Sequence, residues 1–220
     1  MIASFPQPKR QPWRPDVDLA LYSEVSAAEH EERLAWVRWV FQGVRGRCRT
    51  LIFLTESTER VPLLKDWQRY LDQTWLPQLA PALLQSWRAA HEGNDLALIP
   101  VTQKLNLEMS LAKCERSLVA GELLLQATQG AKYQGALGRF RQQVAEGKAE
   151  PHLPVVWAAL AAIFQLPPVD LLAAYLREEW LTAIRDVSHH AEPQGPLSFA
   201  ALAHRALRQA DMIGLQEVVS

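Results

Sequence analysis

The stretch from Leu153 to Leu197 is the feature that most constrains the fold of this chain. It opens with an almost uncharged, alanine-rich segment, passes through the adjacent prolines Pro167 and Pro168, and continues into a longer segment with apolar residues at helical spacing. The stripe on this longer segment consists of Val169, Leu172, Leu176, Trp180 and Val187. Because spacings of three and four residues place side chains on one helix face, we expect two packed helices joined at a proline hinge. A loop with two further prolines and a glycine, ending at Leu197, should follow them.

Helical periodicity also dominates the rest of the 220-residue chain. Runs of alternating β-branched residues bounded by turns, which are typical of strands, are absent. With 49% hydrophobic and 21% charged residues, the chain can bury a sizeable core. We therefore predict an all-α fold, a single helical domain of about eight to ten helices over residues 19–210. Residues 1–18, with four prolines, are expected to form a flexible arm, and residues 211–220 a flexible tail.

Capping and breaking residues mark the expected helix boundaries. The expected helix starts are Ser26 (with Glu29 as a capping box), Pro62, Ser110 and Ser198, and the expected ends are Gly93 and Gly147. Pro77 and Pro81 should bend or break the helix that contains them. One helix is expected over 133–146 and the last over 198–210. Residues 51–54, Leu-Ile-Phe-Leu, fit either a buried helical turn or a short strand.

The helix after Ser110 has an apolar stripe of its own. Its members are Leu111, Cys114, Leu118 and Leu125. Cys114 is therefore interpreted as a small buried hydrophobe. Gly121 inside this helix costs roughly 1 kcal/mol relative to alanine, so we expect it to allow a neighbouring segment to approach closely.

Composition argues against several function classes. A formal net charge of -1 does not favour nucleic-acid binding, and the cluster of Arg45, Arg47 and Arg49 is interpreted as a solvated turn. No apolar run is long enough to span a membrane. Two cysteines far apart in sequence form neither a disulfide framework nor a zinc site, which fits a reducing cytoplasm.

A search for catalytic or metal-binding residues gives weak candidates only. His189 and His190 point about 100° apart on a helix, so we interpret them as closing the helix at the negative end of its dipole, with metal binding as the alternative. Glu178 and Glu179 are interpreted as a solvated face for the same geometric reason. Cys48 lies among arginines, which would lower its pKa. Since nucleophile elbows, dinucleotide fingerprints and P-loops are absent, the sequence offers no candidate active site and no cofactor site.

Three segments together resemble one known family. They are residues 66–96 (DWQRYLDQTWLPQLAPALLQSWRAAHEGNDL), 107–128 (LEMSLAKCERSLVAGELLLQAT) and 153–197, whose second helix contains Ala174-Tyr175-Leu176. In the order of their helices and in their content of small residues they are similar to the urease accessory protein family UreF, over residues 66 to about 207. The chain departs from the family near its N-terminus, where the glycine-containing segment of the family has no counterpart, so it resembles a divergent member.

The resemblance implies an all-α accessory protein that forms a homodimer and has no catalytic activity of its own. It implies binding to a UreD/UreH-type scaffold protein, a UreG-type GTPase and apo-urease, and so assistance with nickel delivery in the cytoplasm. By position it assigns partner binding to Tyr175, Pro196 and Leu197. Core packing is the alternative role for Tyr175.

Two other functions remain open from the residues alone. One is a helical chaperone for another metalloenzyme, such as a molybdenum redox enzyme, or a helical protein-binding module. The other is an enzyme whose polar residues converge only in the fold.

Overall fold

The structure is a computed structural model, and it describes residues 27–129, 135–185 and 192–217. Within these ranges the chain forms helices and no strand, and the all-α fold with eight to ten helices is confirmed. The α-helices are α2 (Ala27–Arg45), α3 (Arg60–Tyr70), α4 (Ala80–His91), α5 (Leu98–Glu108), α6 (Leu111–Ala127), α7 (Ala136–Ala145), α8 (Leu153–Ile163), α9 (Pro168–Ala183) and α10 (Phe199–Glu217). A π-helix, η1 (Leu71–Leu79), and two short 3₁₀ turns, η2 (Asp95–Ala97) and η4 (Gly195–Leu197), complete the set.

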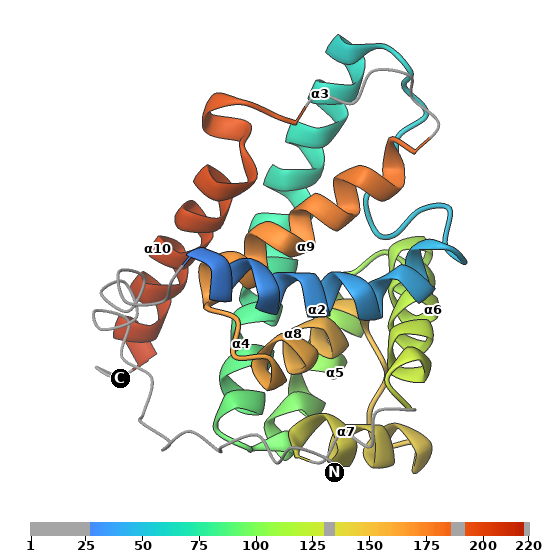
Figure 1. Cartoon of the computed structure of the whole chain (residues 1–220), viewed down its shortest axis with the longest axis vertical. Coiled ribbons are helices and arrows are strands. Elements are labelled where there is room, and N and C mark those ends of the chain that lie inside the picture. The colour runs from blue at the N-terminus through green and yellow to red at the C-terminus, as the bar shows by residue number, and fades with distance from the viewer. Residues whose placement is uncertain (1–26, 130–134, 186–191, 218–220) are drawn as a thin grey trace.

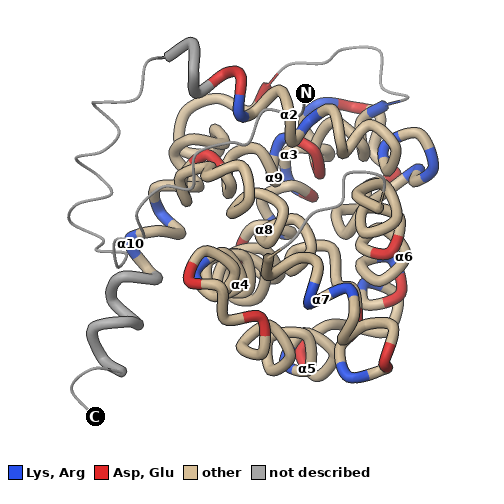
Figure 2. The backbone as a smooth tube through the Cα atoms, turned by 60° about the horizontal axis from the view of Figure 1, so that its bottom comes forward, with Lys and Arg blue, Asp and Glu red and all other residues tan. Residues whose placement is uncertain are grey.

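The alanine-rich helix α8 is the centre of the fold. All residues from Leu153 to Ala162 are buried, as expected for a helix that is apolar on every side. It packs most extensively against α4 and α6, and it also contacts α5, α7 and α9. Charged residues lie on the surrounding helices (Figure 2). The alanine-rich first part of the stretch from Leu153 to Leu197 is therefore part of the hydrophobic core.

The segment from Arg60 to His91 forms one column along the molecule (Figure 1). Of the two outcomes predicted for Pro77 and Pro81, a bend or a break, the break is wrong, because every residue from Arg60 to His91 is helical. Around Pro77 the helix adopts the wider π form over Leu71–Leu79. A π turn relieves the clash between a proline ring and the preceding carbonyl without ending the helix.

Most predicted boundaries agree with the structure. Pro62 lies in the first turn of α3. Helix α4 ends before Gly93, and α7 before Gly147, and both glycines have a positive φ, of 74° and 71°. The Ser198 hydroxyl accepts a hydrogen bond from Ala201 N at 3.3 Å, as expected for an N-cap. Helix α10 continues past the predicted end, to Glu217. The arm at 1–18, Ser26 and the pair His189–His190 lie outside the described residues.

The predicted apolar stripe of α6 is partly wrong. Leu111 is 76% exposed, and the buried face consists of Ser117, Ala120, Gly121, Leu124 and Leu125. This face has small residues because the backbone at Pro151 and His152 lies directly against Gly121. The expected close approach at Gly121 is confirmed, and it rotates the buried face of the helix away from Leu111.

Candidate functional site: buried polar centres and exposed faces

A fully buried carboxylate on α9 joins three parts of the chain. Glu179 is 0% exposed, and its Oε2 accepts hydrogen bonds from Ile52 N at 3.0 Å and Phe53 N at 2.9 Å. The segment 51–53 is buried but neither helical nor paired in a sheet, so its amides need a side-chain acceptor. Both sequence interpretations of this segment, a helical turn or a strand, are therefore wrong. The solvated role expected for Glu179 is wrong for the same reason.

Two buried tyrosines face this carboxylate. Tyr70 and Tyr175 both lie close enough to Glu179 for it to raise their pKa values, in addition to a larger effect of burial. Neither hydroxyl forms a hydrogen bond of ordinary geometry, and Oε1 of Glu179 also lacks one. Burial raises the pKa of Glu179 to about 7, opposed by the two amides and the two tyrosines. The centre therefore titrates near neutral pH.

The neighbouring Glu178 forms an ion pair at the end of α2. Its side chain is 3% exposed, and its Oε2 accepts from Arg45 Nε at 3.0 Å and also from Nη2. Arg185 donates to the carbonyl oxygens of Arg45 and, at 3.3 Å, Cys48. The solvated face predicted for Glu178 is thus wrong, because the C-terminal end of α2 docks on α9 through these charges. In the arginine cluster, Arg47 and Arg49 are exposed beyond the end of α2, as expected for a solvated turn, whereas Arg45 is half-buried and paired.

Cys48 lies beside this ion pair and is 8% exposed. Burial raises the pKa of its thiol, and the smaller opposing effect of Arg185 lowers it. The prediction that neighbouring arginines depress the pKa of Cys48 is therefore wrong, since desolvation of the thiolate outweighs the nearby charge.

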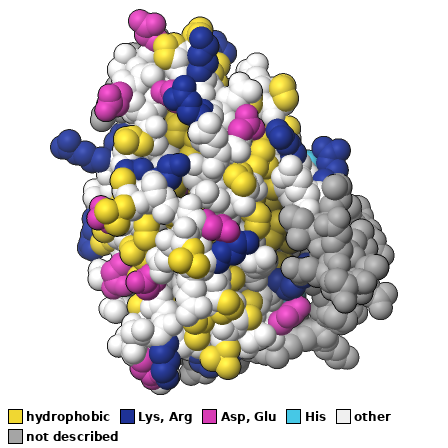
Figure 3. Space-filling model, turned by 180° about the vertical axis from the view of Figure 1, so that it is seen from behind, with side chains coloured by type: hydrophobic (Ala, Val, Ile, Leu, Met, Phe, Trp, Pro, Cys, Tyr) yellow, Lys and Arg dark blue, Asp and Glu magenta, His cyan; other side chains and the backbone are white. Residues whose placement is uncertain are grey.

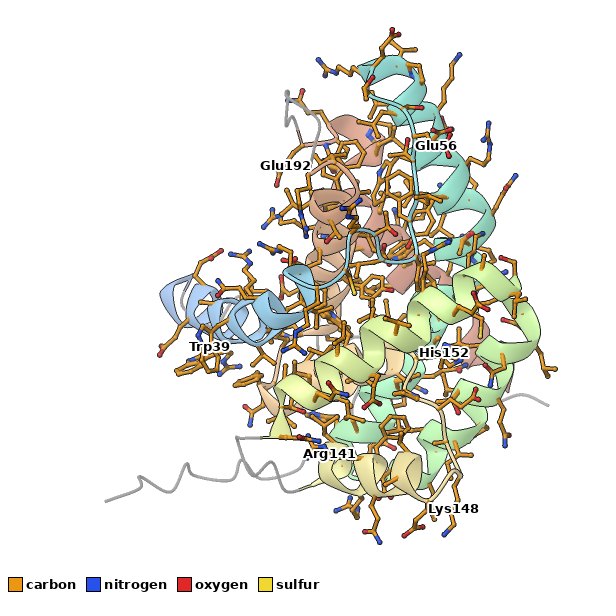
Figure 4. All side chains as sticks on the ribbon, turned by 90° about the vertical axis from the view of Figure 1, so that its right-hand side faces the viewer. Trp39, Glu56, Arg141, Lys148, His152 and Glu192 are labelled. Carbon is orange, nitrogen blue, oxygen red and sulfur yellow. The ribbon has the colours of Figure 1, made fainter. Side chains whose placement is uncertain are left out.

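A second buried network connects α6 with the start of α8. His152 Nδ1 lies 3.1 Å from Ser117 Oγ, and its Nε2 lies 2.9 Å from Asn106 Oδ1. Because the amide oxygen can only accept, Nε2 carries the proton and Nδ1 accepts from the serine hydroxyl. This order resembles a hydrolase triad, but Ser117 and His152 are 0% exposed and Ser117 Oγ also accepts from Leu153 N at 3.2 Å. The network holds the backbone beside Gly121, and Figure 4 shows His152 next to α6.

The stability of the protein should depend on pH through His152. Burial lowers the pKa of His152 to about 4, against the smaller opposite effect of Glu150. Because the folded-state pKa is below the unfolded value of about 6.5, the contribution is complete above pH 6.5 and is lost as pH falls toward 4. We expect the unfolding free energy of the wild type, relative to His152→Gln, to fall by about 2 kcal/mol from pH 6.5 to 5. Urea titrations of both proteins at several pH values measure this, and a pH-independent difference would contradict it.

The three residues assigned to partner binding do not form one surface. Tyr175 is 1% exposed, and its ring meets Trp157 edge-on at 5.8 Å. Pro196 is exposed and Leu197 half-buried, and both lie in η4 just before α10. The turn is thus accessible, whereas Tyr175 is part of the core. Their roles in partner binding stay predictions.

An exposed aromatic cluster lies on α2. Trp36 and Trp39 are 49% and 63% exposed, their rings meet edge-on at 6.0 Å, and Trp36 stacks on Phe164 at 6.5 Å. Trp39 projects away from the body of the molecule (Figure 4). Exposed tryptophans are enriched at the centres of protein interfaces. In the sequence, Trp36 and Trp39 lie beside Val37, Val40 and Phe41, which recur at helical spacing and are buried. Tryptophans outside such a stripe indicate an exposed aromatic cluster. On the opposite face of the molecule, apolar side chains are interspersed with charged ones (Figure 3).

Within the described ranges there is neither a cluster of metal-ligand side chains nor a membrane-spanning helix. The described residues contain no group of three or more His, Cys, Asp or Glu side chains arranged to hold a metal ion. Among the described helices, none combines the length and apolarity that a membrane crossing requires.

Comparison with known proteins identifies the family. The UreF family model matches residues 63–185, from the first turn of α3 to just beyond α9. The chain belongs to the UreF family of urease accessory proteins. No curated protein and no solved structure matches it. Membership of the UreF family implies an accessory rather than a catalytic role in urease maturation.

The UreF match covers some of these features and not others. It contains the His152 network and the Glu179, Tyr70 and Tyr175 side chains of the buried centre, but not the 51–53 segment whose amides Glu179 accepts from. Helix α2 with Trp36 and Trp39 lies outside it, as does the η4 turn. The charged and aromatic side chains of the buried centres therefore belong to the part shared with UreF, and the most accessible candidate contacts flank that part.

Proposed function

We propose that this UreF-family chain assists nickel insertion into urease by binding a UreD/UreH-type scaffold protein and a UreG-type GTPase. It acts in the cytoplasm, as a homodimer, on apo-urease as its client and without a cofactor of its own. Nickel is the cargo of this process. The match to the UreF family over residues 63–185 is the observation that carries the proposal.

The described structure is consistent with a binding role. Its buried polar groups, Glu178, Glu179 and His152, are engaged in holding helices together. Its exposed aromatic cluster on α2 and the accessible turn at Pro196 are the kinds of surface that proteins use for contacts. We place the scaffold contact at this turn, because the resemblance assigns partner binding to Pro196 and Leu197.

Co-purification tests the function. The tagged full chain is expressed with the scaffold protein and the GTPase from the same genome, and the complex is isolated by affinity capture and size-exclusion chromatography. Both partners should co-elute with the tagged chain, and urease co-expressed with all three should contain more nickel than urease made without the chain. If neither partner is retained and the nickel content of urease is unchanged, the proposed function is wrong.

A substitution at the turn tests the placement. Pro196→Arg introduces a long charged side chain at an exposed position, and we expect at least a tenfold weaker capture of the scaffold, since a charge desolvated in an interface costs on the order of 2 kcal/mol or more. Pro100→Arg is the matched control, because Pro100 is also exposed and lies on α5, at the far end of the molecule (Figure 1). Both variants should keep the melting temperature of the wild type. If both variants capture the scaffold equally well, the scaffold contact does not lie at η4.

A further inference from the structure

A polar cleft lies between the 51–57 segment, the α3–η1 column and α6. Its volume is about 530 Å³, which is enough for a small ligand or a side chain of a partner. Asp66, Thr55 and Ser57 line one end, and Thr74, Lys113 and Arg116 line the other. Glu56 also lines the cleft and is exposed, and Figure 4 shows it beside α3.

The two ends of the cleft differ in how their charges are satisfied. Asp66 Oδ2 accepts from Thr55 Oγ1 and Ser57 Oγ, both at 2.9 Å, and its Oδ1 lies 3.5 Å from Arg69 Nη1. The acidic end is therefore compensated within the chain. Its carboxylate is held by its own partners and does not neutralise the cations at the other end.

The cationic end has no such compensation. Lys113 Nζ donates to Thr74 Oγ1 at 2.6 Å. Arg116 Nη2 makes only a long contact of 3.4 Å with Ile52 O, and its buried Nε has no partner. Among the described residues, no carboxylate forms an ion pair with Lys113 or Arg116.

This arrangement is unfavourable in the absence of a ligand. Lys113 and Arg116 are three residues apart on α6, so their like charges face each other on one side of the helix, which destabilises it. Burial lowers the pKa of Lys113, and the charge of Arg116 lowers it further. A half-buried pair of cations, unpaired and open to a cleft, is typical of a binding site rather than of a stabilising surface.

We propose that the Lys113–Arg116 end of this cleft binds an oxyanion, a carboxylate or a phosphate. The guanidinium of Arg116 and the remaining donors of Lys113 provide hydrogen bonds to two oxygens of such a group, and Thr74 holds the ammonium in place. Binding neutralises the like-charge pair, so the ligand is stabilised by the same charges that destabilise the empty cleft. This site lies within the UreF match but does not depend on the proposed partners.

Isothermal titration of the full chain at constant ionic strength tests the proposal. Three probes carry the shared chemistry: inorganic phosphate, succinate, and an acetylated, amidated Asp-Glu dipeptide. Saturable binding of one probe to a single site is expected, and the probe that binds most tightly distinguishes phosphate, a free dicarboxylate and a peptide side chain as the source. If no probe binds saturably, the proposal is wrong.

Matched variants locate the binding. Lys113→Gln and Arg116→Gln should each weaken binding about tenfold, the value of one charge-assisted hydrogen bond. Lys65→Gln on α3 and Arg205→Gln on α10, both exposed and outside the cleft, should stay within about twofold of the wild type, a spread expected for surface changes. Equal weakening by all four would show general charge attraction and overturn the proposal.

Thermal unfolding keeps the test decisive if one variant folds poorly. Without probe, Lys113→Gln should melt at or above the wild-type temperature, because it removes a like-charge repulsion. With saturating probe, the wild type should gain stability as expected for a ligand that binds the folded state, and Lys113→Gln should gain less. A probe that stabilises both proteins equally would contradict a site at Lys113.

Discussion

Replacing Gly121 by alanine is expected to cost the protein about 3 kcal/mol or more of unfolding free energy. A Cβ at this position would lie 1.7 Å from Pro151 O, 2.7 Å from Pro151 C and 2.8 Å from His152 C. All three atoms are backbone, so α6 and the segment before α8 would have to separate. That separation would also disturb the contacts of His152 with Ser117 and Asn106. The gain in helix propensity, about 1 kcal/mol, does not offset this.

Urea unfolding of Gly121→Ala measures the effect, with Gly43→Ala as control. A Cβ at Gly43 in α2 would meet only the Ala127 side chain, at 3.7 Å, so that variant should be neutral or up to about 1 kcal/mol more stable. If the two alanine variants unfold at the same urea concentration, the close approach between α6 and Pro151 is wrong.

The second large effect is expected at Glu179. Burial raises its folded-state pKa to about 7, above the unfolded value of about 4.3. Its contribution to stability is therefore fully present below the unfolded pKa and is lost as pH rises through 7. Glu179→Gln keeps an oxygen that can accept from Ile52 N and Phe53 N but carries no charge. The unfolding free energy of Glu179→Gln should thus rise relative to the wild type by about 3 kcal/mol between pH 4.5 and 7.

Denaturant titrations from pH 4.5 to 8 test this, with Glu115→Gln on the exposed side of α6 as the charge-matched control. The difference between wild type and Glu179→Gln should grow with pH, and a constant difference would contradict a buried, titrating carboxyl. The unfolding free energy contributed by His152 increases with pH over much of the same range, whereas that contributed by Glu179 decreases. The two effects offset each other in the wild type, so each is measured separately in a single variant.

The titration of Glu179 occurs at the point where α9, Tyr70 and the 51–53 segment meet. This segment also forms a wall of the cleft that contains Lys113 and Arg116. The buried centre and the cleft therefore share one backbone segment, which lies just before the UreF match, while Glu179, Lys113 and Arg116 lie within it.

Much of the helical order could be predicted from local sequence. The alanine-rich run predicted the central helix α8, Pro62 predicted the start of α3, and Gly93 and Gly147 predicted helix ends. These features depend on backbone conformation and on periodicity within one segment, so they need no knowledge of distant contacts. The family resemblance rested on the same order of helices and is confirmed by the UreF match.

The buried polar residues could not be predicted in this way. Glu178 and Glu179 look like a solvated pair in sequence, because their partners, Arg45 and the amides of Ile52 and Phe53, are more than 120 residues away. The arginines near Cys48 in sequence indicate a lowered thiol pKa, but the burial that raises it depends on the fold. His152 carried no local signal, since its contacts with Ser117 and Asn106 come from α6 and α5.

Helical character, most helix ends and the family resemblance are all readable from the amino-acid sequence. Three features required the folded chain: which polar groups are buried, the unbroken passage from α3 to α4 through the π turn at Pro77, and the burial of Tyr175 beside the exposure of Pro196. Helix formation depends on neighbours along the chain. The cost of burying a charge, and the partner that offsets it, depend on segments that meet only in the folded protein.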